Sequence, residues 1–178
     1  MNHLATSKED ILAASRDLIK ENGWAAVSIR AVASRCSVSA GTIYNYYESK
    51  ADLLSDTIES IWHEIFFHPE DEQVFHDVES CISWIYERLE YGNRQFPGFF
   101  SLHSFGFMRD EKTSGKKRMM KTWGHILNGL CEVLGNDPKV RADVFDQEFT
   151  EKKFADILFS LILVSMIRQD YDPSSVLM

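Results

Sequence analysis

Cysteine is scarce in this chain of 178 residues, and Cys36, Cys81 and Cys131 stand far apart in the sequence. An odd number of cysteines without paired spacing predicts neither a disulfide framework nor a zinc site, so we expect reduced thiols in a cytoplasmic protein. The longest apolar stretch, residues 157–167, is interrupted by two serines and is too short to span a bilayer. No basic region followed by an apolar run opens the chain, so we expect no secretory signal and no membrane partner.

Signatures of catalysis are also missing. The sequence has no glycine-rich phosphate loop and no nucleophile elbow. His63 and His68 come close to the zinc-protease helix, which needs histidines four residues apart on one face. Five residues place them about 140° apart around a helix. We therefore expect no enzyme, no metal and no cofactor.

The net charge of −8 argues at first against a nucleic-acid partner, but the charge is unevenly distributed. Residues 1–50 carry six basic and five acidic side chains, a net of +1, which leaves −9 for the rest. Even this segment is less basic than a typical DNA-binding domain. A basic cluster without acidic residues follows later in the chain and comprises Lys112, Lys116, Lys117, Arg118 and Lys121. It either assists DNA binding or is a solvated helix end.

Apolar residues recur at helical spacing along the chain, and no segment alternates with a period of two, which predicts an all-α fold. Serines and threonines at N-cap positions indicate where several helices begin. The predicted starts are Ser7 (or Thr6), Ser28, Ser39 and Ser49, with the first helix ending at Asn22-Gly23 and the third at about Tyr46. Further helices are expected from near Val74 to Leu89, from Pro97, from about Lys116 to Leu134, around Val140 to Phe145, and from about Thr150 to Arg168.

The stretch from Ser28 to Lys50 predicts a helix-turn-helix, in which the second helix enters a major groove of DNA. Ser39 leaves the start of this helix open to a phosphate, and Ala40 and Gly41 allow close backbone approach. Ile43 and Tyr47 are expected to point into a small core.

Side chains suited to DNA follow on this short helix and at the start of the next one. Thr42, Tyr44, Tyr46 and Lys50 offer hydroxyls and a charge to phosphates, which position a protein without reading sequence. Asn45 and Tyr46 have the reach for base edges. The alternative for the two tyrosines is that they are ordinary surface aromatics.

This stretch resembles the DNA-binding domain of the TetR family of bacterial regulators over about residues 7–65. The opening S-x-R-x-V-A, the core V-S-x-G-T-I-Y-x-Y-Y and the exit S-K-A-D-L-L occur in order and at family spacing. The resemblance assigns Ser28 and Arg30 to contacts from the second helix, residues 39–42 and 44–46 to the recognition helix, and Lys50 to a phosphate. An ion pair with an acidic neighbour is the alternative for Arg30.

The resemblance also implies an all-helical homodimer in which residues 1–48 bind DNA and residues 49–178 bind an effector and dimerise through the last two long helices. Between Ile157 and Ile167 the last helix is apolar nearly all round, so it needs cover on both sides. A partner subunit would supply that cover; burial within one subunit is the alternative. Two recognition helices about 34 Å apart, or a multiple, would match a palindromic DNA operator.

The middle of the chain is rich in aromatic side chains, which predicts a mostly apolar pocket for a small hydrophobic or aromatic effector. The candidate lining is Trp62, Phe66, Trp84, Tyr86, Phe99, Phe100, His103, Met120 and Trp123, with Ser104 and His125 as further polar groups. The expected function is a sequence-specific transcriptional regulator, by default a repressor that the effector releases. The alternative is a helical interaction protein that holds a partner peptide in an aromatic groove.

Overall fold

The computed structural model describes residues 6–67, 75–100, 114–141 and 143–177, with the side chains of 114–119, 121 and 122 excepted. Every regular element in these ranges is helical, which confirms the predicted all-α fold. Within the same ranges, no helix has the length and apolar character to cross a membrane, and no three metal-binding side chains cluster.

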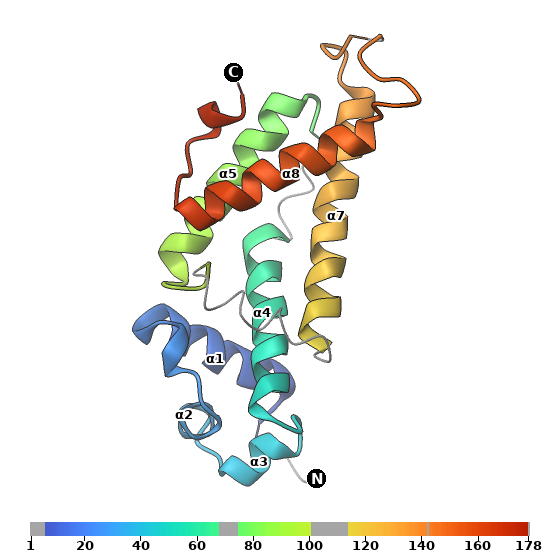
Figure 1. Ribbon diagram of the computed structural model, residues 1–178. Coiled ribbons are helices and arrows are strands. Elements are labelled where there is room, and N and C mark those ends of the chain that lie inside the picture. The colour runs from blue at the N-terminus through green and yellow to red at the C-terminus, as the bar shows by residue number, and fades with distance from the viewer. Residues whose placement is uncertain (1–5, 68–74, 101–113, 142, 178) are drawn as a thin grey trace. The chain divides into compact units, whose positions relative to one another are not determined.

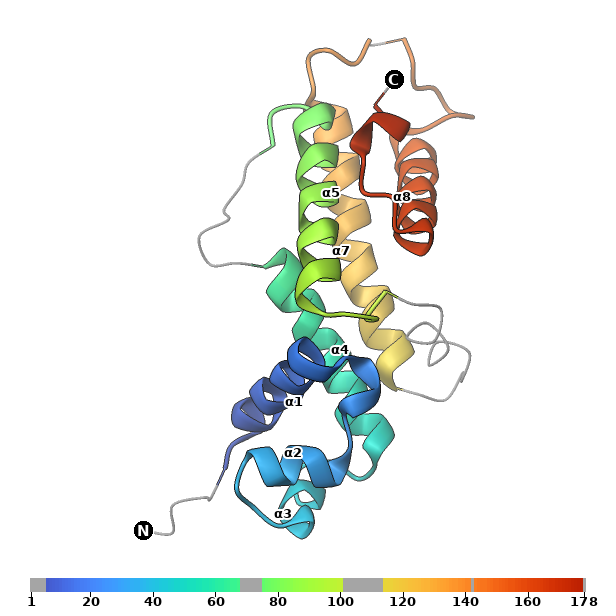
Figure 2. The ribbon, with the colours of Figure 1, turned by 90° about the vertical axis from the view of Figure 1, so that its left-hand side faces the viewer.

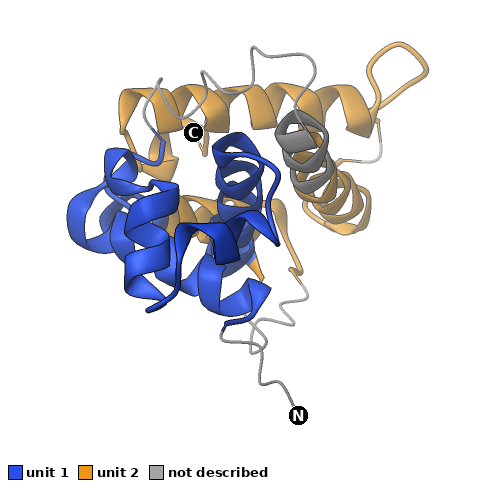
Figure 3. Cartoon of the chain, turned by 90° about the horizontal axis from the view of Figure 1, so that it is seen from below, with its two compact units in different colours: residues 1–66, 92–119 blue, residues 67–91, 120–178 orange. Residues whose placement is uncertain are grey.

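The chain divides into two compact units (Figure 3). The first comprises residues 1–66 and 92–119, and the second comprises residues 67–91 and 120–178. The predicted domain boundary between residues 48 and 49 lies inside the first unit, because the fourth helix belongs to it.

The first unit contains a three-helix arrangement that packs on a longer fourth helix (Figures 1 and 2). Its elements are α1 (Lys8–Asn22), the 3-10 turn η1 (Trp24–Ala26), α2 (Ile29–Arg35), α3 (Ala40–Tyr44) and α4 (Lys50–Phe66). Here α1 packs against α2 and α4, and α2 packs against α3. The core is apolar, with Ile11, Ile19, Val32, Ile43 and Leu53 fully buried.

The predicted caps begin these helices. Ser7 and Asp10 form a reciprocal capping box, in which each side chain accepts the other's backbone N–H. Ser28 and Ser39 accept backbone N–H groups in the first turns of α2 and α3. Gly23, at φ 77°, ends α1 as predicted.

The recognition helix α3 ends at Tyr44, two residues earlier than expected. The amide of Asn45 bonds the carbonyl of Thr42, and the amide of Tyr46 bonds that of Ile43, so the last turn tightens to the 3-10 pattern. Asn45 and Tyr46 therefore lie in a turn.

The second unit joins parts of three helices. They are α5 (Val78–Gln95, of which residues 78–91 belong here), α7 (Ser114–Asn136, residues 120–136) and α8 (Glu151–Arg168), followed by the 3-10 turn η3 (Pro173–Ser175). The Asp137 carboxylate accepts the amide of Val78 at 2.8 Å and so links the end of α7 to the start of α5. The rings of Trp123 and Phe159 lie 5.5 Å apart between α7 and α8.

Two further predictions of helices differ from the structure. The expected short helix around Val140–Phe145 does not form in the described residues, which make turns instead. Aspartates compete with a helix here, since the Asp146 carboxylate accepts the amides of Glu148 and Phe149. From Pro97 to Phe100 the chain also forms turns, and the rest of the helix expected there lies outside the described residues.

Candidate nucleic-acid interface

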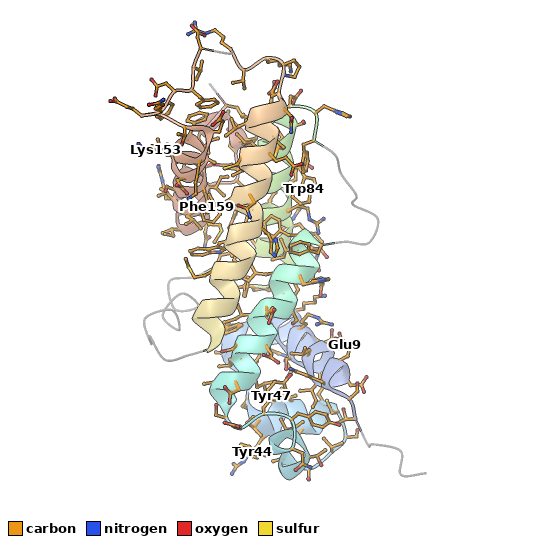
Figure 4. All side chains as sticks on the ribbon, turned by 90° about the vertical axis from the view of Figure 1, so that its right-hand side faces the viewer. Glu9, Tyr44, Tyr47, Trp84, Lys153 and Phe159 are labelled. Carbon is orange, nitrogen blue, oxygen red and sulfur yellow. The ribbon has the colours of Figure 1, made fainter. Side chains whose placement is uncertain are left out.

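The recognition helix presents small and polar groups to solvent and keeps its apolar groups inside. Tyr44 is 55% exposed, and Gly41 and Asn45 are also exposed. Ile43 and Tyr47 are buried, as the sequence predicts (Figure 4 labels Tyr44 and Tyr47). The five-residue helix α3 is therefore held by one face and leaves the other available to a partner.

The small residue at position 41 is not required by the chain's own packing. A Cβ atom added to Gly41 would meet only the Ser39 hydroxyl, at an ordinary contact distance of 3.6 Å. The outer side of α3 therefore has room at position 41.

Three predicted contact residues use their hydroxyls within the chain. Ser28 caps α2 by accepting the amide of Ala31 at 3.1 Å. Ser39 accepts the amide of Thr42 at 3.2 Å, and the two hydroxyls lie 3.0 Å apart. Each hydroxyl oxygen has two lone pairs, so these bonds still leave capacity for an external partner.

Most cations of the first fifty residues are neutralised by ion pairs. The pairs are Lys8 with Asp56, Arg16 with Glu9 and Glu64, Lys20 with Glu64, and Arg35 with Glu21 and Asp17. Hydrogen bonds from Arg35 lower the pKa of Glu21, so this pair stays ionised on both sides near neutral pH. Arg30 and Lys50 are exposed, and neither forms an ion pair with any residue in the described ranges.

Tyr46 differs from the expectation that it faces DNA. Its hydroxyl donates a hydrogen bond to the backbone carbonyl of Thr6 at 2.6 Å, and the residue is half-buried. No local sequence pattern predicts this hydrogen bond, because the two residues are 40 positions apart. A role for Tyr46 at DNA stays a prediction that this geometry disfavours.

The predicted effector residues fall in both units. Trp62, Phe66, Phe99 and Phe100 are buried in the first unit, where the Trp62 ring centroid lies 5.6 or 5.7 Å from each of the others. These four rings pack on one another as a core cluster.

The remaining predicted effector residues have separate surroundings in the second unit. Trp84 packs on Phe75, with ring centroids 5.2 Å apart. Tyr86 is 1% exposed, and its hydroxyl lies 2.9 Å from that of Ser165. Met120 is 57% exposed. His103, Ser104 and the side chains of the basic cluster lie outside the described residues.

Comparisons with known proteins agree with this geometry. Residues 11–57 match the N-terminal domain of bacterial regulatory proteins of the tetR family. The HTH-type transcriptional regulator UidR of Escherichia coli K12 is 38% identical over 48 residues, which are 27% of this chain and 24% of that protein. The matched segment thus spans about a quarter of the length of this curated relative.

Solved structures extend the likeness along the chain. A transcriptional regulator from Rhodococcus sp. Rha1 has a TM-score of 0.67 and 18% identity, over 96% of this chain and 87% of that one. FadR from Bacillus subtilis, solved in complex with stearoyl-CoA, has a TM-score of 0.64 and 17% identity, over 96% and 93%. At these identities the likeness is one of fold. Residues 11–57 therefore match the N-terminal domain of the tetR family of bacterial regulatory proteins, and the chain shares its fold with solved transcriptional regulators.

Proposed function

We propose that this protein is a sequence-specific transcriptional repressor that binds a palindromic operator as a homodimer and leaves it when a small apolar effector binds. One observation carries the DNA-binding part. The helix-turn-helix leaves Arg30 and Lys50 as its exposed cations without ion pairs in the described ranges, on either side of an α3 that exposes Tyr44 and Asn45.

The small number of available cations predicts a weak dependence of affinity on salt. Two cations a subunit, or four in a dimer, correspond to a slope of about −4 in log K against log salt. Removing Lys50 reduces that slope by about one unit per subunit. Specificity then rests on base contacts, and the amide of Asn45 is the group with matching donors and acceptors for adenine.

The homodimer is supported by an apolar stripe on α8. Leu158, Ile162 and Met166 on one face are buried, whereas four side chains on the other face stay 44–50% exposed: Ile157, Leu161, Val164 and Ile167. Their spacing of three and four residues places the exposed set on one side of the helix. A second copy of the same stripe is the cover that a C2 dimer offers.

The energy of this stripe indicates that a second helix takes part. Burying a half-exposed aliphatic side chain contributes about 1 kcal/mol, or about 8 kcal/mol for the eight in a dimer. Association costs about 4–15 kcal/mol, so α8 alone is marginal. On α7, Gly124, Asn128 and Cys131 follow one face, and a Cβ on Gly124 would meet nothing within 4 Å. This open strip of small residues is the candidate second contributor.

Two buried donors in the second unit support an effector that is apolar but carries a hydrogen-bond acceptor. The indole N–H of Trp123 and the hydroxyl of Tyr171 have no hydrogen-bond partner among the described residues. Burial raises the pKa of Tyr171 to about 12, so the phenol keeps its proton. Buried donors of this kind gain from an acceptor such as a carbonyl. The stearoyl-CoA in the similarly folded FadR combines an apolar chain with acceptors.

Release by such an effector requires a coupling free energy between effector binding and DNA binding. A tenfold loss of DNA affinity corresponds to about 1.4 kcal/mol, and DNA must weaken effector binding by the same factor. Titration calorimetry of one fatty acyl thioester, against free protein and against the protein–DNA complex, measures both affinities. Equal affinities would mean that the compound only occupies a cavity.

Electrophoretic mobility shift with the DNA upstream of the encoding gene, against a random duplex, tests the DNA-binding function. We expect preference for the upstream duplex, loss of that preference in Asn45→Ala, and uniform weakening on both duplexes in Lys50→Ala. A helical interaction protein without a DNA role would shift neither duplex.

A further inference from the structure

The start of α1 and the residue before its cap are bonded to the residues that follow α2 and α3. Thr6, just before the Ser7 cap, is 6% exposed, and its carbonyl accepts the Tyr46 hydroxyl at 2.6 Å. The Cys36 thiol, at the end of α2, donates to the carbonyl of Asp10 at 3.8 Å. We call Thr6, Asp10, Cys36 and Tyr46 the N-terminal clasp.

The clasp fixes an element that has little packing of its own. Helix α3 has five residues and a single buried side chain, Ile43. So short a helix is unstable in isolation, and its orientation depends on tertiary contacts at its ends. Tyr46 supplies one such contact at the C-terminal end of α3.

Tyr44 and Tyr46 therefore differ although they are two residues apart. The Tyr44 ring is 55% exposed, and its hydroxyl has no partner in the described ranges. The Tyr46 hydroxyl is engaged, and turning it outward would leave the buried carbonyl of Thr6 without its donor. The Tyr44 hydroxyl is therefore available to DNA, whereas the Tyr46 hydroxyl is bonded within the protein.

We propose that Tyr46 is a positioning residue, which ties the recognition helix to the first turn of α1 through Thr6 and makes no contact with DNA itself. Its effect on DNA affinity rests on the proposed function. The clasp itself is a property of the free protein and can be measured without DNA.

Cys36 provides the readout. Burial raises the pKa of its thiol, the adjacent Thr6 side chain opposes the rise, and the nearby Asp10 carboxylate adds to it. The thiol is therefore protonated near neutral pH and reacts slowly while the first turn of α1 lies beside it. When the clasp opens, the same thiol becomes more accessible and its pKa returns toward the ordinary value.

The experiment compares Tyr46→Phe with the matched control Tyr44→Phe. Iodoacetamide labels the free protein, and mass spectrometry of the Cys36 peptide gives its alkylation rate separately from Cys81 and Cys131. Loss of one neutral hydrogen bond opens the clasp about 2- to 10-fold more often. We expect Tyr46→Phe to raise the Cys36 rate and to weaken binding to the upstream duplex, both within that range. Tyr44→Phe weakens DNA binding and leaves the Cys36 rate unchanged.

Two results would overturn the proposal. If Tyr46→Phe weakens DNA binding at an unchanged Cys36 rate, Tyr46 is a direct contact. If it raises the rate at unchanged DNA affinity, the clasp exists but does not position α3. Should the wild type bind no duplex, the proposed function fails, and the two alkylation rates still decide whether Tyr46 holds the clasp. Equal helix content by circular dichroism confirms that both variants fold.

Discussion

Leu161→Glu is the substitution that tests the dimer through α8. Leu161 is 44% exposed at the centre of the stripe, between Ile157 and Val164. The change removes about 1 kcal/mol of apolar burial per subunit and adds a carboxylate whose desolvation costs several kcal/mol. In the proposed dimer both subunits carry the substitution, so a loss of at least about 4 kcal/mol, or roughly 1000-fold in dimer affinity, is expected.

The isolated subunit should tolerate the same change. An exposed surface substitution alters the free energy of unfolding by only about 0.5 kcal/mol. Sedimentation equilibrium at micromolar concentration, with circular dichroism as the fold control, separates the two effects. Gln95→Glu adds the same charge at an exposed site on α5 and should remain dimeric. A folded Leu161→Glu protein that is as dimeric as the wild type would refute the role of α8.

Three further predictions concern stability, each measured by chemical unfolding. Ser37 has φ 56°, and Ser37→Gly should stabilise the protein by about 0.5–1 kcal/mol because glycine accepts this conformation. Gly92→Ala should destabilise the protein more than Gly129→Ala does. A Cβ at position 92 would lie 2.6 Å from the side chain of buried Ile65, whereas a Cβ at position 129 would meet nothing within 4 Å. Burial raises the pKa of the Cys81 thiol from 9.0 to about 11, so the folded protein holds the thiol proton more tightly than the unfolded chain does. The free energy of unfolding is therefore constant below pH 9 and falls as the pH rises toward 11. The loss is on the order of 2 kcal/mol and should be missing in Cys81→Ala, whereas equal alkaline slopes would contradict it.

The features that sequence predicts well here are local. Ser7, Ser28, Ser39 and Ser49 cap helices as expected, because a cap bonds an amide only three residues away. The burial of Ile43 and Tyr47 also followed from helical spacing within one short motif.

The features that sequence could not predict depend on long-range packing. The Tyr46–Thr6 bond spans 40 positions, and the pair of Lys20 with Glu64 spans 44. The sequence has six basic residues before residue 51, but it does not show which of them form ion pairs with acidic residues. Likewise α8 reads as apolar all round, and only the folded subunit distinguishes its buried face from the exposed stripe.

The salt dependence of DNA binding tests the central claim most directly. Fluorescence anisotropy with the upstream duplex, from about 50 to 200 mM salt, gives the slope for the wild type and for the double variant Arg30→Ala and Lys50→Ala. We predict a wild-type slope near −4 that falls toward zero in the double variant, with Lys8→Ala as the control for a cation already paired with Asp56. A slope unchanged by the double substitution, or a wild type that prefers no duplex, would contradict the account.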